Sequence, residues 1–419
     1  MLSTDTHTLA KILNIDVNHL ASVTFSGVSI DTRKTITNTL FVALSGENFD
    51  AHNYIQQAQE KGAVALIVAK SVDTELPMLV VKNTQIALAD IARYHLNNIK
   101  PKVIAITGSN GKTTVKNLLK NILSLIAPTL ATKGNLNNHL GVPLTLLELT
   151  PKHQYAVIEM GANHLGEIAY LRDIAKPDIA VVTNTGDAHI GEFGGFDNLV
   201  KAKGEIYSNS SQNIVNTQTS YQGDISFGAG GDVSASDIDG NTFTLTIKNK
   251  SIKIQLQLLG RHNIDNALAA SSCAHALGVD IHTIKQGLEA TQAESGRLQI
   301  IKHQQMTLIN DSYNANPQSA KAAIATLNEF SGEKVIVLGQ MAELGQDSDS
   351  LHKEVGEIAK KNSDAFYSFG DNTQNYATDN FTSYGQLARH LLNQHQNATI
   401  LFKGSRIAKL EQIIEKICV

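Results

Sequence analysis

Cysteine is scarce in this chain, with 2 residues, Cys273 and Cys418, among 419. Neither stands in a spacing typical of a metal-ligand pair, and two cysteines are too few for a disulfide framework. We therefore expect free thiols in a reducing compartment.

Long apolar runs and an excess of one charge are also missing. No apolar run approaches the roughly 18 residues needed to cross a bilayer, and the N-terminus has no basic segment followed by an apolar one. Lys and Arg total 35 against 39 Asp and Glu, so the net charge of -4 offers no broad field to attract nucleic acid. We expect a cytoplasmic protein without a membrane span or nucleic-acid partner, whose anionic ligands bind at a local site.

What is present is typical of a globular chain with several domains. A length of 419 residues exceeds what one hydrophobic core usually serves, and 42% apolar with 18% charged residues allows each domain a proper core. No internal repeat or low-complexity tract is evident, which disfavours a solenoid or a linker.

Short apolar runs alternate with helical stretches along most of the chain. We expect strands at 63–68, 78–81, 103–107, 155–160, 179–183, 242–247, 252–258, 306–310, 335–338 and 398–402, with helices at 54–61, 84–97, 112–126 and 263–277. This order predicts an α/β protein of three domains. A small N-terminal α/β domain (1–99) precedes a central domain (100–296), which has a P-loop-type, doubly wound, mostly parallel sheet with a β-rich edge. A Rossmann-like α/β domain (297–419) follows.

The strongest motif is a glycine loop between an expected strand and an expected helix, Thr107-Gly108-Ser109-Asn110-Gly111-Lys112-Thr113-Thr114. Its glycines let backbone N–H groups approach phosphate oxygens, Lys112 supplies a charge for the terminal phosphates, and Thr113 is placed to ligate Mg²⁺. Only two residues separate the glycines, which is closer than in the ordinary P-loop. The alternative is a glycine turn that merely caps a helix.

Other polar residues follow neighbouring strands. Glu159 ends one expected strand and His189 follows the next, and ligands of open α/β sheets bind at such carboxyl ends. Both are candidate metal ligands, although each could be an ordinary surface residue. Lys201 and Lys203 lie on a helical stretch and point to roughly opposite sides of it, so only one can face the site. A solvated basic face is the alternative.

Together these segments resemble the Mur ligases across the whole chain. The resemblance rests on the glycine loop, Thr132 to Pro143, Glu159-Met160-Gly161 and Ala202-Lys203. Further segments are similar to the family members that add D-alanyl-D-alanine: Ser29 to Arg33, Gly46 to His52, Gly296-Arg297-Leu298, Asp311 to Pro317, Val337 to Gly345 and Lys403 to Arg406. Three residues depart from that pattern, because Thr32, Ala51 and Gln340 stand where Ser, Gly and Asp are expected.

The resemblance implies a ligase that uses ATP and Mg²⁺ and forms ADP and phosphate. It would join D-alanyl-D-alanine to the terminal carboxylate of UDP-N-acetylmuramoyl-tripeptide through an acyl phosphate, in peptidoglycan precursor synthesis. A carboxylate is a poor acyl donor, and its activation by ATP brings two anions together, so positive charge must lie between them. We expect a monomer whose domains close when ATP binds.

The resemblance also implies individual roles. Catalysis would use Lys112, Glu159, His189 and Lys203, with Lys203 carbamylated and Lys201 as the runner-up, and the metal ligands would be Thr113, Glu159, His189 and Lys203. ATP would contact Gly108, Ser109, Asn110, Gly111, Lys112, Thr113, Thr114, Asn263, Asn266, Arg297 and Asp311. The other substrates would contact Ser29, Asp31, Arg33, Gly46, His52, Asn135, Asn138, Tyr313, Asn314, Asn316, Lys403 and Ser405.

Alternatives to this assignment differ in the N-terminal domain or in the chemistry. Another Mur-type amino-acid ligase, or a ligase similar to folylpolyglutamate synthases, would share the ATP-binding and closing domains. The latter lack an N-terminal uridine-nucleotide domain. A nucleotide-gated scaffold would keep the loop without the ligation. The third residue of the acceptor peptide, diaminopimelate or lysine, is left open.

Overall fold

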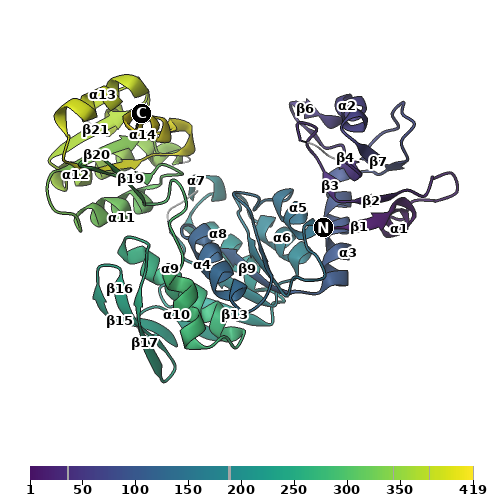
Figure 1. Cartoon of the computed structure of the whole chain (residues 1–419), viewed down its shortest axis with the longest axis horizontal. Helices are drawn as coiled ribbons and strands as arrows, with labels where there is room; N and C mark the ends of the chain where they lie inside the picture. The colour runs from purple at the N-terminus through teal and green to yellow at the C-terminus, as the bar shows by residue number, and fades with distance from the viewer. Residues whose placement is uncertain (35–36, 187–189, 343, 377, 419) are drawn as a thin grey trace.

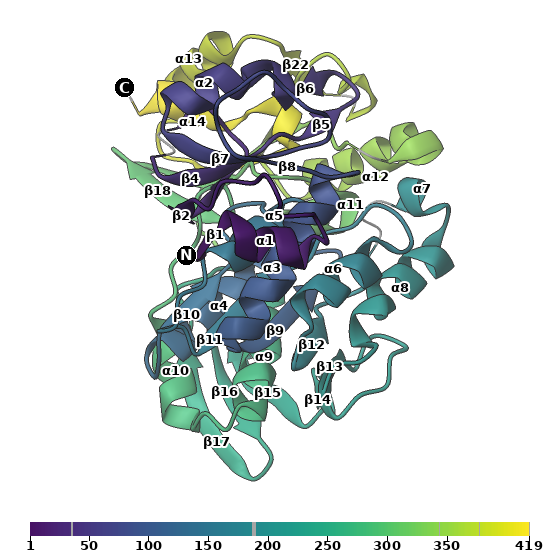
Figure 2. The same ribbon diagram turned by 90° about the vertical axis from the view of Figure 1, so that its right-hand side faces the viewer.

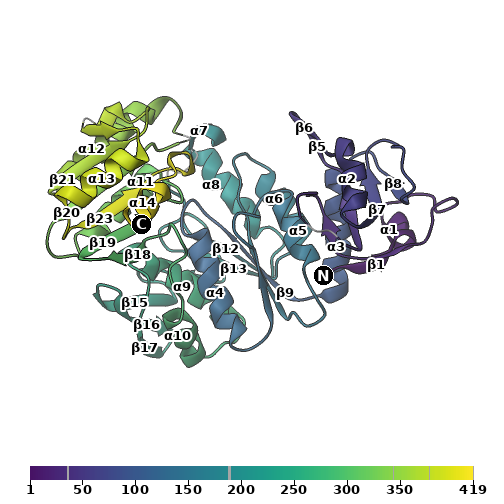
Figure 3. The same ribbon diagram turned by 45° about the horizontal axis from the view of Figure 1, so that its top comes forward.

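The structure is a computed structural model that describes residues 1–34, 37–186, 190–342, 344–376 and 378–418. It forms an N-terminal part (β1 to α3), a central part (β9 to α10) and a C-terminal part (β18 to α14). In Figures 1 and 3 the N-terminal and C-terminal parts lie at opposite ends of the long axis, with the central part between them. The predicted α/β fold with three domains is confirmed.

The N-terminal part is built on a parallel sheet of strand order β3-β4-β7-β8. Strand β7 carries the apolar run AVALIV, which suits a strand buried on both faces. Helix α3 begins after Asn83, whose side chain accepts hydrogen bonds from the first turn, and it shares a core with the central part. The elements are β1 Ser3–Asp5, α1 Thr6–Ile12, β2 Thr24–Ser26, β3 Val28–Ser29, β4 Thr39–Val42, β5 Ser45–Gly46, β6 Phe49–Asp50, η1 Ala51–Tyr54, α2 Ile55–Glu60, β7 Ala63–Val68, β8 Met78–Val80 and α3 Thr84–Ile99.

The central part contains a sheet of nine described strands in the order β10-β11-β9-β12-β13-β14-β15-β16-β17. The strands from β10 to β15 are parallel, whereas β15, β16 and β17 pair antiparallel. The elements are β9 Lys102–Thr107, α4 Lys112–Ser124, β10 Thr129–Ala131, α5 Gly141–Leu147, β11 Tyr155–Glu159, α6 Glu167–Ala175, β12 Ile179–Val182, α7 Ile190–Phe193, α8 Phe196–Gly204, η2 Glu205–Tyr207, β13 Gln212–Asn216, β14 Ile225–Phe227, β15 Val233–Asp239, β16 Thr242–Ile247, β17 Lys250–Gln255, α9 Arg261–Ala276 and α10 Ile281–Glu289.

The antiparallel strands form the β-rich edge that the sequence predicts, and Figure 2 shows them at the end of the molecule farthest from the N-terminal and C-terminal parts. One predicted strand is displaced along the chain, while other predicted ends differ by one or two residues. The last strand spans Lys250–Gln255 instead of 252–258, because a tight turn at Lys248 pairs Ile247 directly with Lys250.

The C-terminal part contains six described strands in the order β18-β19-β23-β20-β21-β22, parallel except for the antiparallel pair β18 and β19. Described helices lie on the sheet, as a doubly wound fold requires. The elements are β18 Gln299–His303, β19 Met306–Asp311, α11 Pro317–Leu327, β20 Lys334–Gly339, η3 Gly345–Asp347, α12 Ser348–Lys361, β21 Ala365–Phe369, η4 Gln374–Tyr376, β22 Asp379–Phe381, α13 Tyr384–Gln394, β23 Thr399–Lys403, η5 Arg406–Ala408 and α14 Glu411–Ile417.

The strand order of two sheets brings polar residues together at the carboxyl ends of their strands. In the central sheet the chain places β10 and β11 on one side of β9 and β12 on the other, so the glycine loop after β9 lies where the strand order reverses. In the C-terminal sheet β19 and β23 are neighbours, and their last residues, Asp311 and Lys403, are paired in register. A membrane-crossing helix is not found within the described ranges.

Candidate active site

A cavity of about 1010 Å³ lies between the central and C-terminal parts. Most of the predicted site residues line it: Ser109, Asn110, Gly111, Lys112, Thr113, Thr114, Asn135, Asn138, Glu159, Lys203, Asn263, Asn266, Arg297, Asp311, Tyr313, Asn314, Asn316 and Lys403. Gly108, Ser405 and the five predicted residues of the N-terminal part are not among the lining residues. His189 lies outside the described residues.

The glycine loop is held in place by the loop that follows β12. The Ser109 hydroxyl donates to the carbonyl of Gly186, and the Asn110 N–H donates to the side-chain oxygen of Asn184. Gly111, with a φ of 81°, opens helix α4, and a Cβ there would meet Asn266 Oδ1 at 2.1 Å. Only glycine fits that backbone. A rigid loop at a helix N-terminus is a ready phosphate-binding site.

Lys112 begins helix α4 and folds back over the loop. Its ammonium donates to the carbonyls of Gly108 at 2.7 Å and Ser109 at 3.2 Å. Burial lowers the Lys112 pKa, an effect that the charge of Glu159 opposes and that of Arg297 reinforces. The ammonium is thus positioned beside the backbone groups that would bind the terminal phosphates.

Glu159 ends strand β11 and is 2% exposed. Asn137 Nδ2 donates to its Oε1 at 2.9 Å, while its Oε2 has no hydrogen-bond partner in the described part of the chain. A buried carboxylate oxygen without a donor is costly unless a cation binds it. This orphaned oxygen, in a cavity that also includes the Thr113 hydroxyl, fits a magnesium ligand.

Lys203 on helix α8 faces the cavity, whereas Lys201 is exposed, so the helix resolves the choice that the sequence leaves open. The Lys203 side chain is among the largest fully buried ones, and its ammonium lies 5.4 Å from the centre of the Phe193 ring. Burial, with a smaller contribution from the charge of Lys112, lowers the Lys203 pKa to about 7. A neutral amine is the form that can react with CO₂.

The acidic ligands of this site are few. No group of three or more His, Cys, Asp or Glu residues that could hold a metal ion occurs among the described residues. A magnesium ion at Glu159 would therefore need phosphate oxygens and the Thr113 hydroxyl, and a carbamate on Lys203 would add a further anionic oxygen ligand. This donor set fits a metal that enters with a nucleotide.

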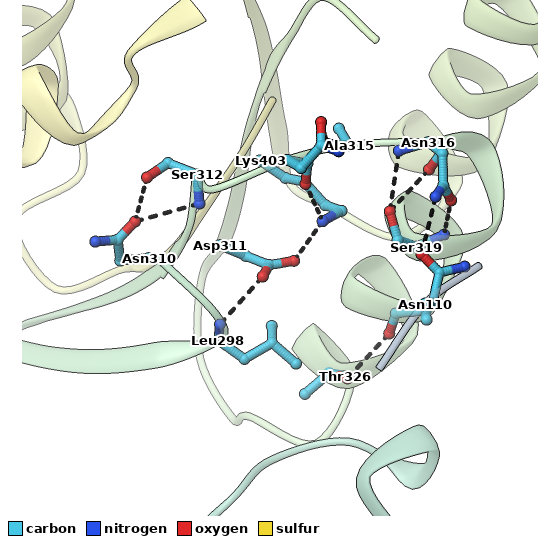
Figure 4. A network of polar contacts seen from close by, with 12 residues as sticks. Asn110, Leu298, Asn310, Asp311, Ser312, Ala315, Asn316, Ser319, Thr326 and Lys403 are labelled. Carbon is cyan, nitrogen blue, oxygen red and sulfur yellow. Dashed lines mark hydrogen bonds and ion pairs between the residues drawn. The ribbon is translucent and has the colours of Figure 1, made fainter. Parts of the chain in front are cut away.

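The C-terminal part contacts the glycine loop directly. Arg297 Nη2 donates to the Thr113 hydroxyl at 3.0 Å, and the Arg297 guanidinium stacks over the Tyr313 ring at 4.1 Å from its centre. Asn316, which caps helix α11, donates to Asn110 Oδ1 at 2.9 Å (Figure 4). The two parts therefore meet at the glycine loop.

An ion pair between the buried Lys403 and the partly buried Asp311 joins the carboxyl ends of β19 and β23. Figure 4 shows Lys403 pointing at Asp311, with 2.6 Å between Nζ and Oδ2, and donating as well to the carbonyl of Asn314. The other oxygen of Asp311 accepts the backbone N–H of Leu298. Asp311 and Lys403 thus hold the loop around Asn314 against the cavity.

Asn263 and Asn266 lie in the first turns of helix α9. Asn266 Nδ2 donates to Asn263 Oδ1, and Asn263 Nδ2 donates to the carbonyl of Leu259. Both side chains are buried. Their mutual hydrogen bond fixes the orientation of two amides beside the glycine loop.

The predicted residues of the N-terminal part gather at the carboxyl edge of its own sheet. Arg33 donates twice to Asp31, and these hydrogen bonds lower the Asp31 pKa to about 2. His52 accepts the N–H of Ala69 on Nε2, and its Nδ1 lies 2.5 Å from Asp50. Ser29 ends β3, and Gly46 is exposed in the β5–β6 hairpin. The structure brings these residues to one edge but not to the cavity.

Sequence reasoning missed several residues around the cavity. Asn137, Asn184 and His262 line it, and Lys116 lies behind Glu159. Asn137 stands in the asparagine-rich segment Asn135-Leu136-Asn137-Asn138, a signal that could have marked it. Lys116 stands four residues after Lys112, on the same helix face, which is the signal that helix geometry provides.

Three family models match successive parts of the chain. They are the Mur ligase family, catalytic domain, at residues 24–105, the Mur ligase middle domain at 106–274, and the Mur ligase, glutamate ligase domain, at 296–416. The chain is also similar over nearly its whole length to curated proteins named UDP-N-acetylmuramoyl-tripeptide--D-alanyl-D-alanine ligase. The one from Escherichia coli strain K12 is 40% identical, covering 99% of this chain and 98% of that protein. The one from Bacillus subtilis strain 168 is 34% identical, covering 93% and 92%.

Solved structures agree with these sequence matches. MurF from Acinetobacter baumannii superposes with a TM-score of 0.95 at 37% identity, covering 100% of this chain and 99% of that one. The MurF ligase from Thermotoga maritima in complex with ADP gives a TM-score of 0.85 at 28% identity, covering 94% and 97%. Escherichia coli FolC, at 17% identity and a TM-score of 0.63, covers 78% and 92% and shows a shared fold alone.

Proposed function

This chain belongs to the Mur ligase family, and from that premise we propose that its central cavity joins D-alanyl-D-alanine to UDP-N-acetylmuramoyl-tripeptide at the expense of ATP. It is a ligase of peptidoglycan precursor synthesis. The observation that carries the assignment to this cavity is the grouping of Lys112, Glu159 and Lys203 with the glycine loop around one cavity.

The chemistry requires two anions to meet, the acceptor carboxylate and the terminal phosphate of ATP. The glycine loop binds phosphate through backbone N–H groups, and Lys112 places a positive charge beside them. Arg297 brings a second cation from the C-terminal part to Thr113. Magnesium held by Thr113 and Glu159 would add positive charge where the anions meet. Closure of the walls from both parts would exclude water from the acyl phosphate.

We infer that Lys203 carries a carbamate. An ammonium at this position would repel a divalent cation, whereas a carbamate would supply an anionic oxygen ligand. The low pKa that burial gives the Lys203 amine, about 7, supports this, because the neutral amine reacts with CO₂. His189 remains a proposed metal ligand.

We propose the remaining substrate contacts from the resemblance to the Mur ligases. The nucleotide-linked precursor would bind Asn135 and Asn138 of the central part. It would also bind the edge of the N-terminal sheet that carries Ser29, Asp31, Arg33, Gly46 and His52. The dipeptide would enter from the C-terminal side, where Tyr313, Asn314, Asn316, Lys403 and Ser405 cluster around β19 and β23. Asn263, Asn266, Arg297 and Asp311 would contact ATP.

We also propose a role for each domain. The N-terminal domain (1–99) would bind the precursor, the central domain (100–296) ATP, and the C-terminal domain (297–419) would close over ATP and bind the dipeptide. Closure on nucleotide binding, a monomeric state and a cytoplasmic location are also parts of the proposal.

Phosphate release measured with single omissions tests the assignment. The complete mixture holds the protein, ATP, Mg²⁺, UDP-N-acetylmuramoyl-tripeptide and D-alanyl-D-alanine. We expect release only when all are present, with diaminopimelate-containing and lysine-containing tripeptides compared in parallel. Release that continues without the dipeptide would leave an ATPase and remove the ligase assignment. Release with a folate and glutamate in place of these substrates would favour a folylpolyglutamate synthase activity.

A further inference from the structure

Lys116 is a buried lysine with no place in the reaction described above. It lies in helix α4, one turn after Lys112, and its side chain is 3% exposed. Its Nζ lies 3.9 Å from Glu159 Oε2, the oxygen that has no hydrogen-bond partner in the described part of the chain. The pair is close enough for ionic attraction and too long for a hydrogen bond.

The two lysines of this helix turn have different partners. Lys112 donates to the carbonyls of Gly108 and Ser109, so its charge is directed at the loop. The ion pair that the structure gives Lys116 is with Glu159. Asn137 holds Oε1 of that carboxylate, which leaves Oε2 facing Lys116. Charge on Lys116 therefore acts mainly on the proposed metal-binding oxygen.

A buried carboxylate needs a countercharge before the metal arrives. Removing one partner of a buried ion pair leaves an uncompensated charge, which is strongly destabilising. Lys116 can supply that charge without occupying a hydrogen-bonding position of Oε2, since the distance of 3.9 Å leaves the lone pairs of Oε2 free. Glu159 is thereby buried beside one cation, while its Oε2 keeps room for a second.

We propose that Lys116 is the resident counter-cation of Glu159, which neutralises the carboxylate until the metal binds and whose charge sets the metal concentration at which the site fills. This rests on the proposed function, since it takes Glu159 as a metal ligand. Lys116 is a positioning residue and not a catalytic one. Repulsion between Lys116 and the incoming divalent cation keeps metal binding weaker than Glu159 alone would make it.

Metal binding to the Lys116→Met variant tests this. Free Mn²⁺ is followed by electron paramagnetic resonance during titration of the protein with ADP present. We expect the half-saturating Mn²⁺ concentration to fall about tenfold, equivalent to about 1.4 kcal/mol. Lys116→Arg, which keeps the charge, should stay near the parent value. Lys120→Met is the matched control, because Lys120 is an exposed lysine one turn further along the same helix.

Thermal unfolding without metal provides the second measurement. Lys116→Met should unfold at a lower temperature than the parent, and Mn²⁺ should raise its unfolding temperature more than that of the parent. If Lys116→Met does not fold, Lys116→Gln takes its place, with the same expected tightening of metal binding.

Two outcomes of the Mn²⁺ titration have different consequences. Weaker or unchanged Mn²⁺ binding in Lys116→Met and Lys116→Gln, with normal binding by the parent, would overturn the counter-cation role and leave the ligase assignment intact. Failure of the parent protein to bind Mn²⁺ with ADP would remove the metal site itself, and this inference with it.

Discussion

A Lys203→Ala variant is expected to turn over about 10²–10³-fold more slowly than the parent. This is the usual effect of removing one group that stabilises transition-state charge. Lys203 is buried on helix α8 at the cavity, where burial lowers its pKa to about 7. If the side chain acts as a carbamate, the alanine variant lacks a carboxylate that a small molecule can replace. Added formate or acetate should therefore restore part of the turnover.

The matched control for this experiment is Lys201→Ala. Lys201 is two residues away on the same helix and is exposed, so its removal should leave turnover within about twofold of the parent because surface substitutions are usually mild. Full activity of Lys203→Ala without any added carboxylate would refute the carbamate role. A loss that no carboxylate rescues, with the fold intact by circular dichroism, would assign Lys203 a different role.

Replacing Lys112 by Ala should reduce ATP-dependent phosphate release by about 10³-fold without unfolding the protein. Lys112 donates to the carbonyls of its own loop, Gly108 and Ser109, so the substitution removes the charge beside the phosphates while the neighbouring strand and helix stay packed. Steady-state kinetics at saturating ATP measure the loss. No added carboxylate should rescue it, in contrast to Lys203→Ala.

The Lys112→Arg variant tests whether a positive charge at this position is sufficient. The Arg guanidinium keeps the charge, but it is planar and longer, so it should not replace the compact ammonium held between two carbonyls. Turnover of Lys112→Arg within a few-fold of the parent would show that charge alone is required. Wild-type turnover in Lys112→Ala would contradict the phosphate-binding role of the loop.

Local signals made the centre of the site predictable from sequence. The apolar strand β9, two glycines in a short loop and the helix that starts at Lys112 all depend on residues next to one another in the chain. Gly111 has the positive φ that such a loop needs. The strand, loop and helix are therefore found where the sequence predicts them.

Features that depend on packing were less predictable. Helix periodicity indicated that only one of Lys201 and Lys203 could face the site, but only the packed structure shows which one is buried. Strand β17 begins and ends earlier in the chain than the predicted strand 252–258, because a turn at Lys248 sets its register. The ion pair of Lys116 with Glu159 is not predictable from sequence, because it depends on how strand β11 packs beside helix α4.

Transfer of oxygen from substrate to phosphate tests the central claim most directly. UDP-N-acetylmuramoyl-tripeptide is labelled with ¹⁸O in its terminal carboxylate and turned over with ATP, Mg²⁺ and D-alanyl-D-alanine, and the released phosphate is analysed by mass spectrometry. Activation of that carboxylate by phosphorylation in the cavity predicts one ¹⁸O atom in each phosphate formed from a fully labelled carboxylate. Phosphate without label, formed together with the ligated product, would contradict it.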